Sequence, residues 1–84
     1  MLSREEIFSG LKEILVSMDP SKEEAMSKVN ESTKLVEDLG LMSVSLLYMV
    51  ISIEERFNID LGNVGVNDFH TVGDVIAYIQ KVSE

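Results

Sequence analysis

The chain has no cysteine and only one histidine, so several kinds of chemistry are excluded at the outset. Without cysteine there can be no disulfide, no thiolate metal site and no cysteine nucleophile. The absence is typical of proteins from a reducing compartment. The single histidine, His70, stands just before a predicted helix cap, so we interpret it as an exposed turn residue.

Paired catalytic groups are also lacking. The acidic residues at positions 5, 6, 23, 24, 54 and 55 form adjacent pairs, and neighbours on a helix do not face each other. There is no glycine-rich phosphate loop and no metal-ligand spacing. We therefore expect no metal site and no enzymatic activity, because no base accompanies a nucleophile.

Long apolar segments are missing as well. No apolar run approaches the roughly 20 residues needed to cross a bilayer, and the first residues lack the pattern of a signal peptide. The formal net charge is −8, so nucleic acid and anionic lipid should repel the chain, whereas basic patches on proteins should attract it. We expect a cytoplasmic monomer that binds proteins rather than nucleic acid or membranes.

The sequence does contain the pattern of one small helical domain over residues 1–84. Ser3 and Glu6 form a capping-box pattern at the start of the first helix, and Asp19-Pro20 ends that helix. Thr71 and Asp74 form a second cap pair before the closing helix. The apolar faces of these two helices consist of Ile7, Leu11, Ile14, Leu15 and Met18, and of Val72, Val75, Ile76, Ile79 and Val82.

The segments between the helices are less regular. Residues 21–28 can form a helical turn, and the loop that follows should contact the core through Leu35, Val36 and Leu39. Gly40 is suited to a sharp turn because glycine tolerates a positive φ angle. A short helix is expected around residues 64–69. The prediction is an all-α, four-helix bundle with a long loop after the first helix and a short third helix.

The central segment, residues 43–57, is apolar on two sides. The predicted core face consists of Leu46, Met49, Val50, Ile53 and Phe57. A second flank consists of Val44, Leu47, Tyr48 and Ile51. A small domain cannot easily bury both sides, so part of this flank should be exposed and available to a partner.

Ser43 begins this central helix. From its position alone, Ser43 is best explained as an N-cap, because serine is among the preferred capping residues. A helix start also favours bound phosphate through its free N–H groups and its dipole. Both interpretations are compatible with the position of Ser43.

The residues around Ser43 resemble those of the acyl carrier protein family. Members typically read E-D-L-G-x-D-S-L, then a helix that ends in L-E-E-x-F, then a closing helix of the form T-V-x-x-x-x-x-Y-I. The corresponding segments here are Glu37-Asp38-Leu39-Gly40-Leu41-Met42-Ser43-Val44, Ile53-Glu54-Glu55-Arg56-Phe57 and Thr71-Val72 through Tyr78-Ile79. The resemblance covers nearly the whole chain and is firmest from residue 35 to residue 79.

The resemblance implies a four-helix carrier bundle with 4′-phosphopantetheine joined to Ser43 through a phosphodiester. A phosphopantetheinyl transferase would install this arm from coenzyme A. Acyl groups would be held as thioesters on the arm and delivered to enzymes such as an acyltransferase or a ketosynthase. The carrier itself would catalyse nothing.

The resemblance also assigns two groups of residues. The partner-binding face would consist of Val44, Leu47, Tyr48, Ile51, Glu54 and Glu55. The residues that can shelter an acyl chain would be Leu46, Val50, Ile53, Leu61, Phe69 and Val75, which are core residues by default.

The chain departs from the family pattern beside the serine. Met42 and Val44 replace the usual aspartate and leucine, and Ser45, Tyr48 and Ser52 occupy outer positions that are commonly acidic. This difference predicts a specialised carrier in a lipid or polyketide-type pathway rather than in bulk fatty-acid synthesis. Two alternatives remain: an interaction module that has lost the arm, and an aminoacyl carrier.

Overall fold

A computed structural model of the chain describes residues 2–62 and 69–83. These residues form helix α1 (Arg4–Met18), a 3₁₀ turn η1 (Pro20–Lys22), and helices α2 (Glu23–Ser27), α3 (Ser43–Phe57) and α4 (Val72–Val82). The described residues contain four α-helices and no strand, so the predicted all-α class is confirmed. The short helix found here, α2, precedes the central helix, whereas the short helix predicted around residues 64–69 lies almost entirely outside the described residues.

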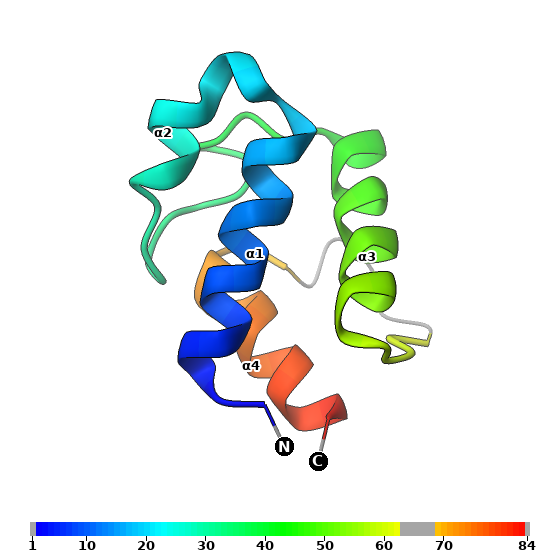
Figure 1. Cartoon of the computed structure of the whole chain (residues 1–84). Coiled ribbons are helices and arrows are strands. Elements are labelled where there is room, and N and C mark those ends of the chain that lie inside the picture. Colours follow the sequence, from blue (N-terminus) through cyan, green and yellow to red (C-terminus); the bar gives the residue numbers. More distant parts are fainter. Residues whose placement is uncertain (1, 63–68, 84) are drawn as a thin grey trace.

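Helix α1 is central to the bundle and packs against α2, α3 and α4. The start of α1 and the end of α4 lie at one end of the molecule, and α3 begins at the other end (Figure 1). Ser43, the first residue of α3, is therefore held away from both chain termini.

The helix starts follow the capping rules. The Ser3 hydroxyl accepts from the Glu6 backbone N–H, and the Glu6 carboxylate accepts from the Ser3 N–H. Thr71 and Asp74 form the same reciprocal pair at α4. Each pair satisfies two backbone donors that a helix leaves unpaired in its first turn. Both predicted cap pairs are confirmed.

The predicted apolar faces form one core. Its buried residues include Ile7, Leu11, Ile14 and Leu15 from α1, Leu46, Met49, Val50 and Ile53 from α3, and Val72, Val75, Ile76 and Ile79 from α4. Met18, Phe57 and Val82 are partly buried against it. Helix α2 adds Met26, and the loops add Val29, Leu35, Leu39, Leu41, Leu61 and Phe69.

One predicted core contact is wrong. Val36 is 55% exposed, whereas Leu35 and Leu39 on either side of it are buried as predicted. The chain turns tightly here, with the Asp38 N–H donating to the Lys34 carbonyl at 2.9 Å and the Gly40 N–H donating to the Val36 carbonyl at 3.0 Å. The turn directs Leu35 inward and leaves Val36 on the surface.

The loop and the start of α4 are held together by backbone contacts. Lys34 and Thr71 form an isolated antiparallel bridge. The Leu35 N–H donates to the His70 carbonyl at 2.9 Å, and the Val72 N–H donates to the Thr33 carbonyl at 3.0 Å. His70 itself is exposed, as predicted.

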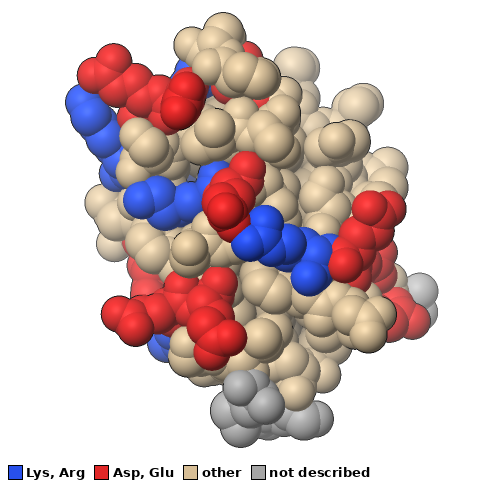
Figure 2. Space-filling view, viewed as in Figure 1, with Lys and Arg blue, Asp and Glu red and all other residues tan. Residues whose placement is uncertain are grey.

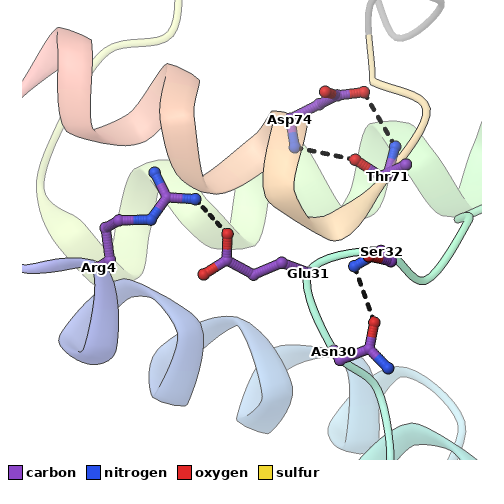
Figure 3. A network of polar contacts seen from close by, with 6 residues as sticks. All are labelled: Arg4, Asn30, Glu31, Ser32, Thr71 and Asp74. Atoms are coloured by element: carbon purple, nitrogen blue, oxygen red, sulfur yellow. Dashed lines mark hydrogen bonds and ion pairs between the residues drawn. The ribbon is translucent and has the colours of Figure 1, made fainter.

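A polar junction reinforces this attachment (Figure 3). The Arg4 guanidinium of α1 is paired with the Glu31 carboxylate of the loop. One residue earlier, the Asn30 side chain accepts from the Ser32 N–H at 2.8 Å and keeps the loop turned. Three segments distant in sequence therefore meet near the start of α4.

Candidate functional site

The turn that precedes α3 is held by its own polar groups. The Asp38 carboxylate accepts from the Lys34 N–H at 2.8 Å, and the Leu41 N–H donates to the Leu35 carbonyl at 3.1 Å. Gly40 has φ +69°, a left-handed conformation that glycine adopts with little strain. Leu39 and Leu41 are buried on either side of this glycine. The chain therefore passes from the buried Leu41 to the exposed Met42 and Ser43 where α3 begins.

Ser43 is exposed and is the first helical residue of α3. The structure corrects its interpretation as the N-cap, because that position belongs to Met42, whose backbone is extended. The Leu46 N–H donates to the Met42 carbonyl at 2.8 Å, which begins the helical hydrogen bonding one residue earlier than a Ser43 cap would require. Ser43 is therefore not needed as the helix cap.

No side-chain hydrogen bond caps α3 at Met42, which contrasts with α1 and α4. The backbone N–H groups at the start of a helix have no partner within the helix. Such groups, together with the helix dipole, favour a bound phosphate. The start of α3 therefore presents backbone N–H groups beside the exposed Ser43.

The predicted partner-binding flank of α3 is exposed. The exposed fractions are 81% for Val44, 54% for Leu47, 56% for Tyr48 and 47% for Ile51. We call these four residues the apolar strip. Met42, directly before Ser43, is 75% exposed and extends the apolar surface past the serine.

The two acidic residues predicted for the same face differ in their surroundings. Glu55 is exposed, whereas Glu54 is partly buried. The Glu54 carboxylate accepts from the Leu61 N–H at 2.9 Å. Its backbone carbonyl also accepts from Ile59, after the chain reverses at Asn58 with φ 54°. Glu54 therefore positions the loop after α3, a role that the sequence pattern did not indicate.

The residues predicted to shelter an acyl chain are all buried in the core: Leu46, Val50, Ile53, Leu61, Phe69 and Val75. They come from α3, from α4 and from the connection between these helices. Phe69 also contacts Tyr78 of α4 edge to face, with ring centroids 5.7 Å apart. The structure brings all six residues into one apolar cluster at the heart of the bundle.

Backbone donors at the start of α4 stabilise a charged carboxylate there. The Thr71 N–H, with the nearby His70 N–H and the Thr71 hydroxyl, stabilises the Asp74 carboxylate and holds the pKa of Asp74 below its ordinary value. The Asp74 carboxylate thus remains charged and completes the cap of α4. The capped start of α4 is joined to the loop before α3 by the hydrogen bonds Val72 N–H to Thr33 carbonyl and Leu35 N–H to His70 carbonyl.

Comparisons with known proteins identify the family. A scan against models of protein families finds no match. The acyl carrier protein of Thermotoga maritima is 40% identical over 81 residues, which cover 96% of each chain. The acyl carrier protein of Wolinella succinogenes is 39% identical over 75 residues, which cover 88% of this chain and 93% of the relative.

This chain belongs to the acyl carrier protein family. The meromycolate extension acyl carrier protein of Mycolicibacterium aurum is also similar, with 32% identity over an alignment of 85 positions that covers 98% of this chain and 81% of that protein. Membership confirms the resemblance to acyl carrier proteins seen in the sequence. No helix formed by the described residues is long and apolar enough to cross a membrane.

Proposed function

We propose that this chain carries acyl intermediates as thioesters on a 4′-phosphopantetheine arm attached to the Ser43 hydroxyl. The observation that carries the proposal is the exposed position of Ser43 at the uncapped start of α3, in a member of the acyl carrier protein family. The arm would supply the thiol, so the absence of cysteine is no obstacle.

The chain's own residues would present the arm rather than react with the cargo. The turn at Gly40 and the buried Leu39 and Leu41 fix the start of α3, so the Ser43 hydroxyl has a defined place on the surface. The first-turn N–H groups would stabilise the phosphodiester. We infer that the protein is a carrier and not an enzyme, and that acyl transfer occurs on its partners.

The partners in this proposal are a phosphopantetheinyl transferase and the enzymes that load and unload acyl groups, such as an acyltransferase or a ketosynthase. They would dock on the apolar strip together with Glu54 and Glu55. The uncharged outer positions Ser45 and Ser52 support a specialised lipid or polyketide-type pathway. Brisk loading by the malonyl transferase and ketosynthase of bulk fatty-acid synthesis would contradict that assignment.

The acyl chain itself would insert among the buried residues between α3 and α4, namely Leu46, Val50, Ile53, Leu61, Phe69 and Val75. All six residues belong to the buried hydrophobic core, where an acyl chain would be removed from water. A loaded acyl chain should shift the NMR signals of these methyl and aromatic groups and raise Tm relative to the unloaded arm. Unchanged signals and Tm would place the cargo outside the core.

Intact mass tests the attachment. Protein incubated with coenzyme A and a phosphopantetheinyl transferase should gain one phosphopantetheine, and the Ser43→Ala variant should gain none. Met42 replaces the aspartate that usually precedes the serine in the family, so a panel of transferases should be used rather than one. Failure of every transferase, with Ser43 also unmodified in protein from its native cells, would favour an interaction module without the arm.

A further inference from the structure

The residues proposed to shelter the acyl chain are closely packed, and we call them the acyl cluster: Leu46, Val50, Ile53, Leu61, Phe69 and Val75. Each is at most 8% exposed. Protein interiors are packed as densely as organic crystals, so an acyl chain cannot enter the cluster unless part of it moves. Four members belong to α3 or α4, whereas Leu61 and Phe69 lie in the connection between these helices. Leu61 and Phe69 can therefore move without breaking a helix.

Leu61 is held by one side chain from each of the two helices. Its backbone N–H donates to the Glu54 carboxylate of α3 at 2.9 Å. Its carbonyl oxygen accepts from the Tyr78 hydroxyl of α4 at 3.4 Å. The Leu61 side chain is only 2% exposed. Both backbone groups of Leu61 are thus paired with side chains of the helices that border the acyl cluster.

Tyr78 also contacts the other member of the cluster that lies outside the helices. The rings of Tyr78 and Phe69 meet edge to face, with centroids 5.7 Å apart and planes at 73°. This is one of the favourable arrangements of two aromatic rings. Tyr78 is partly buried against the core and is not among the residues that the sequence assigned to the site. A single side chain of α4 therefore holds both Leu61 and Phe69.

The residues on either side of Leu61 form a turn of their own. The Asp60 carboxylate accepts from the Gly62 N–H at 2.7 Å. Gly62 has φ +63°, a conformation that glycine adopts with little strain. This hydrogen bond involves neither α3 nor α4, so it can persist when the turn moves away from them. Loss of the contacts to Glu54 and Tyr78 would therefore release Leu61 as part of an intact turn.

The surroundings of Glu54 separate it from the solvated acidic groups. Figure 2 shows acidic side chains spread over the visible surface, as expected for a chain with a formal net charge of −8. Glu55 is exposed, whereas the neighbouring Glu54 is partly buried and bonded to the Leu61 N–H. Hydrogen bonds to a charged group are roughly twice as strong as those between neutral groups. The Glu54 contact is therefore the stronger of the two that hold Leu61.

We propose that Glu54 and Tyr78 are positioning residues that clamp Leu61 onto the acyl cluster, and that a long acyl chain enters the cluster only when Leu61 is released. The inference rests on the proposed function, because it assumes that the cargo inserts among these buried residues. It adds the two side chains that set the cost of insertion. A long cargo shifts the chain towards the released form, whereas a cargo too short to reach the core leaves the clamp closed.

The test compares Tm for the full chain whose arm has been loaded to completion with either an acetyl or an octanoyl group. Glu54→Ala removes the acceptor of the Leu61 N–H. We expect this variant to lower Tm of the acetyl form by about 4–8 °C. The loss in the octanoyl form should be less than half as large, because the long chain has already released Leu61. A residue that only stabilises the fold would lower both values equally.

Three further variants identify the contact that is responsible. Glu54→Gln retains an oxygen that can accept from the Leu61 N–H, so it should recover at least half of the loss in the acetyl form. Tyr78→Phe removes the hydroxyl and keeps the ring against Phe69, so it should give a smaller loss with the same dependence on cargo. Glu55→Ala removes the exposed neighbouring carboxylate and should change both Tm values by no more than about 2 °C.

Amide hydrogen exchange at Leu61 tests the clamp without any cargo. In the unmodified chain, the Leu61 N–H should exchange at least about fivefold faster in Glu54→Ala than in the parent. Equal exchange rates would overturn the inference, as would equal losses of Tm in the acetyl and octanoyl forms, and either result leaves arm attachment at Ser43 unaffected. Failure of every transferase to load the parent would instead overturn the proposed function and the inference together.

Discussion

The backbone N–H of Gly73 donates to the carbonyl oxygen of Glu31 at 2.8 Å, so the first turn of α4 lies directly against the loop that leads to the site. A Cβ atom at Gly73 would lie 3.0 Å from that same carbonyl oxygen. The neighbouring atom belongs to the backbone and cannot turn aside as a flexible side chain could. The loop backbone at Glu31 therefore leaves little room for a side chain at Gly73.

Replacing Gly73 tests this contact. Alanine is favoured over glycine in a helix interior by about 1 kcal/mol, so propensity alone predicts that Gly73→Ala is stabilising. We expect it instead to lower Tm by a few degrees, because the loop backbone at Glu31 must move away. Thermal unfolding by circular dichroism measures the change.

The matched control lies on the same helix. Ala77 is exposed in α4, and Ala77→Gly should cost about 1 kcal/mol through propensity alone. If Gly73→Ala raises Tm, the close approach to Glu31 has no energetic importance.

The charge of Asp74 should contribute to stability in a defined pH range. Because the pKa of Asp74 is lowered by folding, its contribution is present above the pKa of the unfolded chain and is lost as pH falls through the folded value. Asp74→Asn should lower Tm by about 2–5 °C near neutral pH. The difference in Tm between parent and variant should shrink towards zero as pH falls through the lowered pKa of folded Asp74. A difference that stays constant to low pH would mean that the charge is not responsible.

The apolar strip should matter for partners and not for folding. Leu47 and Ile51 are 54% and 47% exposed, so Leu47→Arg and Ile51→Arg should leave the helical circular dichroism spectrum unchanged. Both should slow arm transfer at least about tenfold, because a charge replaces apolar contact in the docked complex. Ala77→Arg, on an exposed position of α4, is the control and should have no effect. Equal rates for all three variants would contradict docking on the strip.

The two faces of α3 should respond differently to the same change. Ile53 is fully buried and Ile51 is 47% exposed, although they are only two residues apart. Ile53→Ala should lower the free energy of unfolding by about 2–5 kcal/mol, the usual cost of truncating a core side chain. Ile51→Ala should cost well under half as much. Urea unfolding of both variants measures the difference, and similar losses would show that the core face is misassigned.

Local patterns were sufficient to predict the three long helices. The Ser3–Glu6 and Thr71–Asp74 pairs marked two starts, and Asp19-Pro20 marked an end, because caps and proline act within a few residues of the chain. Periodicity separated the core face of α3 from the apolar strip.

Contacts between distant segments could not be predicted in this way. The exposure of Val36, the Lys34–Thr71 bridge and the Glu54–Leu61 hydrogen bond depend on how the loops return to the bundle. The placement of Met42 rather than Ser43 at the cap depends on how the preceding turn enters α3.

The most direct test of the carrier assignment is the intact mass of the protein purified from the cells that produce it, before and after treatment with hydroxylamine. We expect a phosphopantetheine on Ser43, with a further acyl mass that hydroxylamine removes because it cleaves thioesters. The mass of the unmodified chain alone, with Ser43 free in every molecule, would contradict the account.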